Sequence, residues 1–127
     1  MAKVKDVMRT EVQGIGPEAT VKEAAERMAA LEVVLLPVLE NDYLLGTISA
    51  YDIVARSTAA GRDPRSQPVK TVMNRGALSC REDQEAGEAA ALMSRELVRR
   101  LPVVTAENRV TGMLLRADVV AESEAAR

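Results

Sequence analysis

The stretch "GTISAYDIVAR" at residues 46–56 has a second version in the same chain, "GMLLRADVVAE" at residues 112–122. Both versions run from a glycine through apolar residues to an aspartate that two β-branched residues follow. Only the first version carries a hydroxyl, at Ser49, three residues before its aspartate. A pattern that occurs twice in one order predicts an internal duplication.

The duplication extends over nearly the whole chain. At an offset of 65 residues the matched segments are "VKDVM" (4–8) with "VKTVM" (69–73) and "LPV" (36–38) with "LPV" (101–103). One extra residue then enters a turn, and an offset of 66 pairs Gly46 with Gly112 and Asp52 with Asp118. We therefore predict a first repeat at residues 1–60, a linker at 61–68 and a second repeat at 69–127.

Each repeat predicts the element order β-α-β-β-α, which is an α/β (α+β) class. Thr20, with Glu23 three residues later, is the signature of a capping box at a helix start, and Asp83 is the expected cap in the second repeat. The apolar run around Pro37 predicts a strand, and its proline belongs at an edge or a strand end. One repeat has too little core to be stable alone, so we expect the two to pack about a pseudo-two-fold axis as one module.

Composition excludes several classes of function. The formal net charge of -2 argues against binding to nucleic acid, which needs a basic face. The chain has no histidine, so no Ser-His-Asp or Cys-His nucleophile can form. The single Cys80 allows no intrachain disulfide and no cysteine metal cluster, and we interpret it as a buried residue, with a reactive thiol as the alternative. No signal segment or membrane span is evident, so we expect a cytoplasmic protein without a membrane partner.

Two copies in register of this motif order, from "VKDVM" through an Ala/Met helix and "LPV" to "G" and "D-[IV]-V", resemble a tandem pair of cystathionine β-synthase (CBS) domains, also called a Bateman module. The resemblance covers roughly residues 3–122. It implies a regulatory binding module of the stand-alone bacterial type, not an enzyme. In that family, adenosine-containing ligands such as AMP, ADP, ATP or S-adenosylmethionine bind in clefts between the two repeats.

The resemblance assigns candidate ligand-binding residues. The family's motif is a glycine, an apolar stretch and [ST]-x-x-[DN], whose hydroxyl and carboxylate hold the ribose or a nearby phosphate. "GTISAYD" matches it with Gly46, Ser49 and Asp52, whereas "GMLLRAD" keeps Asp118 but has Leu115 in the hydroxyl position. We therefore expect one binding site per chain. From the residues alone, Ser49 and Asp52 are equally explained as a helix cap, and the two roles are compatible.

Further candidates come from position along the chain. Arg99 and Arg100 precede the second "LPV", where the family often uses basic residues to reach phosphates, and a guanidinium suits that task. A solvated strand entrance is the alternative reading of both. Ile15 and Pro37 would line the cleft of the first repeat against the adenine. Weaker candidates near the linker are Arg56, Arg62 and Arg65.

Two functions from different classes remain at this stage. The first is a small sensor that binds an adenine nucleotide and acts as a homodimer, with no required cofactor and no metal. The second is a dimerisation or protein-interaction module with empty or degenerate nucleotide sites and an unidentified protein partner. An enzyme ranks third, because no convergent acid-base set, phosphate-cradling loop or metal-ligand spacing stands out.

Overall fold

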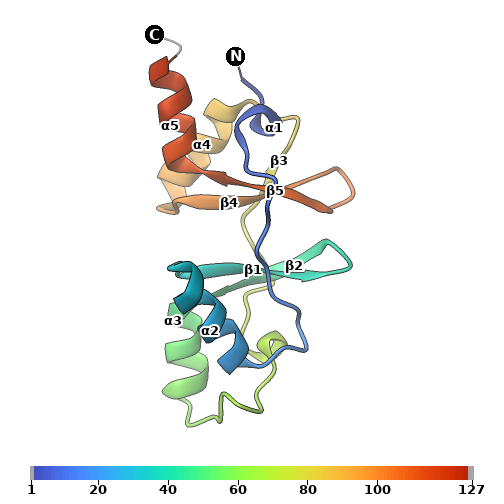
Figure 1. The fold of residues 1–127 in the computed structure, drawn as a ribbon, viewed down its shortest axis with the longest axis vertical. Helices are drawn as coiled ribbons and strands as arrows, with labels where there is room; N and C mark the ends of the chain where they lie inside the picture. Colours follow the sequence, from blue (N-terminus) through green and yellow to red (C-terminus); the bar gives the residue numbers. More distant parts are fainter. Residues whose placement is uncertain (1, 126–127) are drawn as a thin grey trace. The chain divides into compact units, whose positions relative to one another are not determined.

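The computed structural model describes residues 2–125, and its elements follow the duplicated order (Figure 1). They are α1 (Val4–Val7), α2 (Val21–Leu31), β1 (Leu35–Glu40), β2 (Tyr43–Ser49), α3 (Ala50–Ile53), the π-helix η1 (Val54–Thr58), the 3₁₀-helix η2 (Val69–Thr71), β3 (Cys80–Arg81), α4 (Ala86–Glu96), β4 (Arg100–Val104), β5 (Val110–Leu115) and α5 (Arg116–Ala125). This mixture of helices and small sheets confirms the predicted α/β class.

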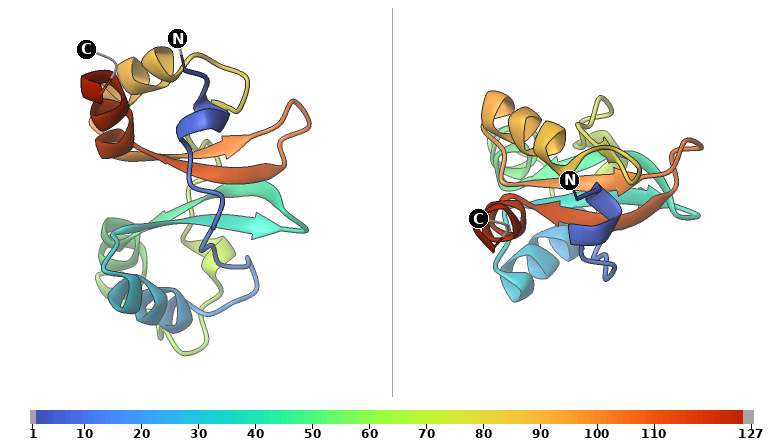
Figure 2. Two further views of the ribbon diagram at one scale, coloured as in Figure 1. Left: turned by 45° about the horizontal axis from the view of Figure 1, so that its top comes forward. Right: turned by 90° about the horizontal axis from the view of Figure 1, so that it is seen from above.

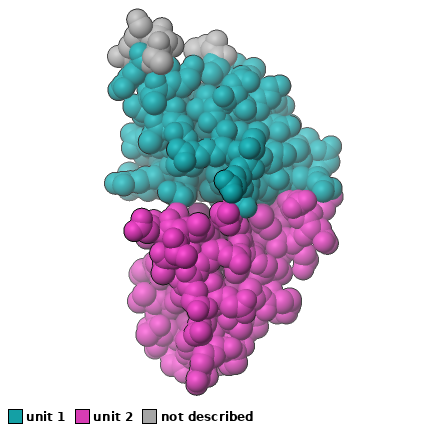
Figure 3. All heavy atoms as spheres, viewed as in Figure 1, with its two compact units in different colours: residues 1–12, 78–127 teal, residues 13–77 magenta. Residues whose placement is uncertain are grey.

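The chain forms two compact units, and each unit contains a short segment from the other sequence repeat. Unit 2 contains Gln13–Ala77, and unit 1 combines Met1–Val12 with Leu78–Arg127 (Figure 3). The units divide after residues 12 and 77, whereas the predicted repeats are separated by the linker at 61–68. The repeat boundaries stay a prediction. Each sequence repeat therefore lends its first segment to the unit that the other repeat builds.

Unit 2 is built on a two-stranded antiparallel hairpin. β1 pairs with β2 in a register that sets Leu36 opposite Ile48, and α2 and α3 lie on one face of it in both views (Figures 1 and 2). The extended piece expected before α2 makes only one parallel bridge, Ile15 with Val38. The core consists of Ile15, Val21, Ala24, Met28, Leu36, Val38, Ile48, Val69, Val72 and Met73.

Unit 1 has a three-stranded sheet in the order β3-β4-β5. Its first strand, β3, pairs in parallel with β4 at two residues, Cys80 and Arg81. The corresponding segment of unit 2 makes only the single bridge at Ile15. α4 and α5 cover one face of the β4–β5 hairpin (Figure 2). The core consists of Val4, Cys80, Ala86, Ala89, Met93, Leu101, Val103, Leu114 and Val119.

The two matching segments "VKDVM" and "VKTVM" explain the exchange. Val4 is fully buried in the core of unit 1, although it belongs to the first sequence repeat. Val69 and Val72 are fully buried in the core of unit 2, although they belong to the second. We call residues 2–9 and 68–74 the two straps. Each strap fills part of a core that its own repeat does not build, and this burial of apolar side chains stabilises both units.

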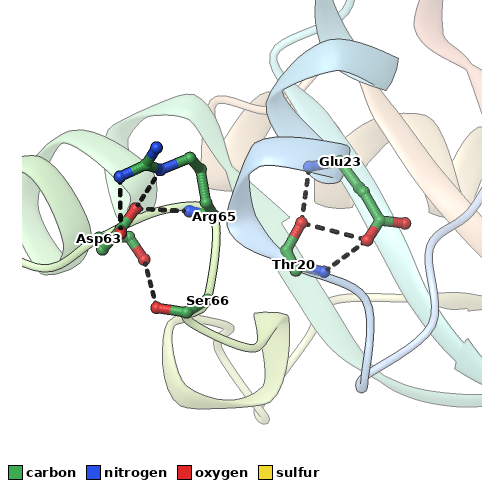
Figure 4. A network of polar contacts seen from close by, with 5 residues as sticks. All are labelled: Thr20, Glu23, Asp63, Arg65 and Ser66. Carbon is green, nitrogen blue, oxygen red and sulfur yellow. Dashed lines mark hydrogen bonds and ion pairs between the residues drawn. The ribbon is translucent and has the colours of Figure 1, made fainter.

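The start of α2 confirms the predicted capping box. Thr20 Oγ1 accepts a hydrogen bond from Glu23 N at 3.1 Å, and Glu23 Oε1 accepts from Thr20 N at 3.3 Å (Figure 4). The next free helix N–H groups are satisfied by the segment expected as a linker: Val21 N donates to Gln67 O and Lys22 N to Pro64 O. This segment is therefore folded onto unit 2.

The predicted cap of the second long helix is wrong. Asp83 lies in the turn before α4 and accepts a bond from Arg81, whereas the N-cap residue is Glu85, which makes no side-chain cap bond. The reason is the first strap. Ala86 N at the helix start donates to Ala2 O at 2.9 Å, and Lys3 forms an ion pair with Glu85 at 2.8 Å. Main chain from the strap thus takes the place of a side-chain cap.

Candidate functional site

Ser49 and Asp52 meet at the junction of β2 and α3. Ser49 ends the strand and caps the helix, since its Oγ accepts a hydrogen bond from Asp52 N at 3.1 Å. In return, Asp52 Oδ2 accepts from Ser49 N at 2.9 Å. The capping role that the residues alone suggested is therefore confirmed, and a role in ligand contact stays a prediction.

Asp52 has a further partner that sequence reasoning missed. Asn74 Nδ2 donates to Asp52 Oδ1 at 3.1 Å and to Oδ2 at 2.9 Å. The Asp52 side chain is buried, with 5% of the residue exposed. Its carboxylate is held by neutral donors, because the described residues place no cation in an ion pair with it. A buried charge needs such hydrogen bonds to be tolerated.

The second strap also explains Gly46. Thr47 and Asn74 form a bridge, with Thr47 N to Asn74 O at 2.9 Å and Asn74 N to Thr47 O at 2.8 Å. A Cβ atom at Gly46 would lie 2.1 Å from Asn74 O, so only glycine admits the strap. The glycine that the resemblance assigned to ligand binding therefore has a structural role in unit 2.

Unit 1 repeats this arrangement with different chemistry. Arg9, 65 residues before Asn74, forms a bridge with Met113, and its carbonyl oxygen lies where a Cβ of Gly112 would come within 2.6 Å. Its guanidinium binds Asp118 from Nε at 2.9 Å and from Nη2 at 3.2 Å. This hydrogen bond and the charge of Arg9 hold the pKa of Asp118 below its usual value. Asp118 is thus engaged by an internal cation.

Ile15 and Pro37 are part of the core of unit 2. Ile15 N donates to Pro37 O at 3.0 Å, and Leu39 N donates to Ile15 O at 2.9 Å. Ile15 is only 4% exposed and Pro37 is among the fully buried side chains. Pro37 has no N–H to offer the segment at Ile15, which agrees with a bridge one residue long. Their predicted contact with adenine stays a prediction.

Arg99 and Arg100 border a pocket of about 530 Å³ in unit 1. Its wall also includes Leu115, Arg116 and Val120. Arg100 pairs with Leu115 across β4 and β5, and Arg116 N donates to Arg99 O at 2.8 Å. Three arginines therefore line one hollow that runs along the ten-residue helix α5, with Glu124 as the acid in its wall, and this surplus of positive charge favours a phosphate or carboxylate.

The eight candidates fall into two groups. Unit 2 holds Gly46, Ser49, Asp52, Ile15 and Pro37, and unit 1 holds Arg99, Arg100 and Asp118. Reasoning from the sequence missed Asn74, Arg9 and Arg116. The duplication held a signal for two of them, because Arg9 and Asn74 occupy the same place in the repeat. Arg116 had a weaker signal, as a third arginine beside the motif residue Leu115.

Comparison with known proteins identifies the family. The model of the CBS domain matches residues 4–58 and, a second time, residues 69–125. The chain belongs to the CBS domain family. The resemblance drawn from the duplicated motifs is therefore confirmed, and each match covers one copy of the duplicated pattern.

Several CBS domain proteins are similar along nearly their whole length. CBS domain-containing protein YhcV of Bacillus subtilis is 36% identical over 119 residues, 94% of this chain and 84% of that protein. The structure of CBSX2 from Arabidopsis thaliana in complex with AMP has a TM-score of 0.82 at 29% identity, covering 98% of both chains. That of Hypoxic Response Protein I with two coordinated zinc ions has a TM-score of 0.84 at 28% identity, covering 96% of this chain and 99% of that one.

Two further observations concern the described residues of this chain. Within residues 2–125, no three His, Cys, Asp or Glu side chains gather in a way that would hold a metal ion. Across the same residues, no helix combines the length and the apolar character that crossing a membrane requires.

Proposed function

We propose that this CBS domain pair is a regulatory module, without catalytic activity of its own, that binds an adenosine-containing metabolite such as AMP, ADP, ATP or S-adenosylmethionine. The observation that carries the proposal is the arginine-lined pocket of unit 1. Arg99, Arg100 and Arg116 border it together, and its volume of about 530 Å³ lies within the usual range for small-molecule sites.

The wall of this pocket suits a nucleotide in two ways. Guanidinium groups keep their charge at any physiological pH and bind phosphate oxygens in a forked geometry. Leu115 and Val120 supply apolar surface in the same wall, on which a base can lie. The proposed ligand thus lies in the repeat whose motif has Leu115 in place of the hydroxyl, and not at the Ser49–Asp52 motif that the sequence favoured. The likeness to CBSX2, whose structure contains AMP, supports this ligand class over other anions.

Ligand binding would regulate the module by linking β4 to α5. Arg99 and Arg100 lie at the start of β4, and Arg116 is the first residue of α5. An anion that contacts all three ties the entrance of the strand to the start of the helix. A ligand that binds only the folded state stabilises it by RT ln(1 + [L]/Kd), about 2.7 kcal/mol at a hundredfold excess over Kd. A partner that recognises α5 would sense that change.

Isothermal titration calorimetry with AMP, ADP, ATP, NAD and S-adenosylmethionine tests the proposal. Arg100→Ala should weaken binding of the preferred ligand by roughly tenfold or more, since a charge-assisted hydrogen bond to phosphate contributes about 1.5–3 kcal/mol. Arg95→Ala is the matched control, because it removes the same charge from the end of α4 outside the pocket wall. Equal weakening by both variants, or no binding of any ligand, would overturn the assignment.

A second candidate function has its own observation. Three apolar side chains of unit 2 are strongly exposed: Val34 at 73%, Tyr51 at 76% and Val54 at 57%. Val34 O accepts a hydrogen bond from Ala50 N, which brings the first of them beside α3. An exposed apolar group of this kind is typical of an interaction surface. Under this reading the chain is a dimerisation or protein-interaction module.

Light scattering during size-exclusion chromatography separates the two functions. A homodimer that Tyr51→Glu converts to monomer, in a protein that binds none of the nucleotides, would favour the interaction module. Lys22→Glu on the exposed face of α2 is a matched control for the added negative charge. Nucleotide binding that persists in monomeric Tyr51→Glu would favour the sensor.

A further inference from the structure

A second, larger pocket lies in unit 2, and none of the eight candidate residues lines it. Its volume is about 820 Å³, and the polar residues in its wall are Arg56, Arg62, Asp63, Ser66, Gln67 and Thr71. The wall therefore combines the helix that follows β2 with the segment after Gly61. None of Ile15, Pro37, Gly46, Ser49 and Asp52 lines it, whereas Arg56 and Arg62 are the weaker candidates that the sequence offered near the linker.

The pocket is formed by a widened helix. After α3 the chain continues as the π-helix η1, in which Ala59 N donates to Val54 O at 2.8 Å. Arg62 N then donates to Ser57 O at 2.9 Å, and Gly61 takes the left-handed conformation at φ 71° that turns the chain back. Single π-turns within helices are frequent at functional sites, because they displace side chains from regular helical positions.

Two buried polar atoms near this turn lack hydrogen-bond partners among the described residues. They are Gln67 Oε1 and Ser57 Oγ. Gln67 belongs to the pocket wall, and its Nε2 already donates to Arg56 O at 3.5 Å, which leaves its oxygen as the free acceptor. A buried polar atom without a partner costs free energy, and it is relieved by a ligand that supplies the missing group. At Gln67 the missing group is a hydrogen-bond donor.

The charged groups in the wall favour an anion. Arg56 is fixed by bonds from Nη1 to Val72 O at 3.0 Å and to Met73 O at 3.4 Å. Arg62 makes no side-chain hydrogen bond or ion pair within residues 2–125, so its guanidinium is available. Asp63 is neutralised by Arg65, which contacts its two carboxylate oxygens at 3.2 Å each (Figure 4). Two arginines thus line the pocket against one compensated carboxylate.

We infer that this pocket is a second binding site, for a small phosphate monoester that carries a free hydroxyl group. The phosphate binds the guanidinium groups of Arg56 and Arg62, and the hydroxyl donates its hydrogen bond to Gln67 Oε1. The site is independent of the nucleotide pocket proposed for unit 1, because the two pockets share no residue.

The test follows backbone amide resonances of the full chain during titration with glycerol 3-phosphate, which combines both chemical features. Saturable shifts are expected at residues 55–71. Arg62→Ala should weaken this binding at least tenfold. Gln67→Glu should weaken it as well, because a second carboxylate repels the phosphate. Lys70→Ala is the matched control, since it removes one positive charge from neighbouring η2 outside the pocket wall and should leave affinity within twofold.

Two further titrations test the ligand class. Inorganic phosphate should bind at least fivefold more weakly than glycerol 3-phosphate, and glycerol alone should give no saturable shift. Equal affinity for phosphate and its ester would overturn the role of Gln67. The whole inference is overturned if no shifts occur at residues 55–71, or if Arg62→Ala and Lys70→Ala weaken binding equally. AMP shifts confined to the pocket of Arg100 would leave that proposal intact.

Discussion

Asn74 donates its side-chain amide to both carboxylate oxygens of Asp52, over 3.1 and 2.9 Å. Arg9 makes the corresponding contact to Asp118 in unit 1. In both units the residue that ends a strap holds the aspartate that follows the Gly motif. The motif aspartates therefore hold the straps in place through hydrogen bonds. The neutral amide is paired with a buried carboxylate and the guanidinium with a more exposed one.

Asp52→Ala should lower the free energy of unfolding by about 1–3 kcal/mol, because it removes the reciprocal cap with Ser49 and leaves Asn74 without its acceptor. Urea unfolding followed by circular dichroism measures this loss. Asp118→Ala is the comparison in the same place of the other repeat, and it should cost less because its ion pair with Arg9 is partly solvated. Equal losses would contradict a structural role specific to Asp52.

Gly46→Ala should destabilise unit 2 by about 1–3 kcal/mol, in the range of other overpacked sites. The new Cβ would lie 2.1 Å from Asn74 O, so the second strap must move. Gly87→Ala provides the control, because Gly87 is the second residue of α4 and a Cβ added there would meet nothing within 4 Å beyond its own helix backbone. That change should stabilise by up to about 0.5 kcal/mol, since alanine favours helix but Gly87 lies in the first turn. Thermal and urea unfolding of both variants measure the contrast.

The sequence was sufficient for the features that local chemistry decides. The Thr20–Glu23 capping box and the two hairpins follow from short patterns, and the duplicated motifs indicated the family. Asp83 shows where this reasoning fails. Its helix begins two residues later than the aspartate suggests, because Ala2 from the first strap already satisfies the helix start. A contact between residues so distant in sequence leaves no local pattern.

The candidate site was predicted less completely for the same reason. Ser49 and Asp52 were identified, but their partner Asn74 comes from the other repeat. Arg99 and Arg100 were identified, and the third arginine of their pocket was not, because β5 had to be paired with β4 to bring Arg116 beside Arg99. Motifs thus predicted single side chains, whereas the pairing of distant segments decided what surrounds them.

The ion pair between Arg9 and Asp118 should make stability depend on pH. The hydrogen bond and charge of Arg9 lower the pKa of Asp118 from its ordinary 3.8 in the folded protein. Its contribution is therefore complete above pH 3.8 and is lost as the pH falls through the lower folded value. Arg9→Met keeps the strap's main-chain bridge but removes this effect.

Urea unfolding at pH 6 and pH 3 should thus show a smaller acid-induced loss in Arg9→Met than in the unmodified protein. Other acid pairs, such as Asp63 with Arg65, titrate in both proteins and cancel in the difference. Lys22→Met is the control, because its partner Glu26 is exposed and their contact is long at 3.5 Å. If the free energy of unfolding falls as much on acidification in Arg9→Met as in the unmodified protein, the Arg9–Asp118 pair is not the cause of that decrease.

Cys80 should be unreactive as long as unit 1 is folded. It is 3% exposed in the core, its Sγ donates to Pro102 O at 3.9 Å, and burial raises the pKa of its thiol to about 11. At pH 8 only about one thiol in a thousand is then the reactive thiolate. Ellman's reagent should therefore label the native protein at the rate at which unit 1 opens, and subdenaturing urea should accelerate labelling.

The raised pKa of Cys80 also makes the free energy of unfolding depend on pH. The contribution of Cys80 is complete below pH 9.0, its ordinary value, and is lost as the pH rises towards about 11. Cys80→Ala should abolish labelling and flatten that alkaline loss, whereas immediate labelling of the native protein at pH 8 would instead indicate a reactive thiol.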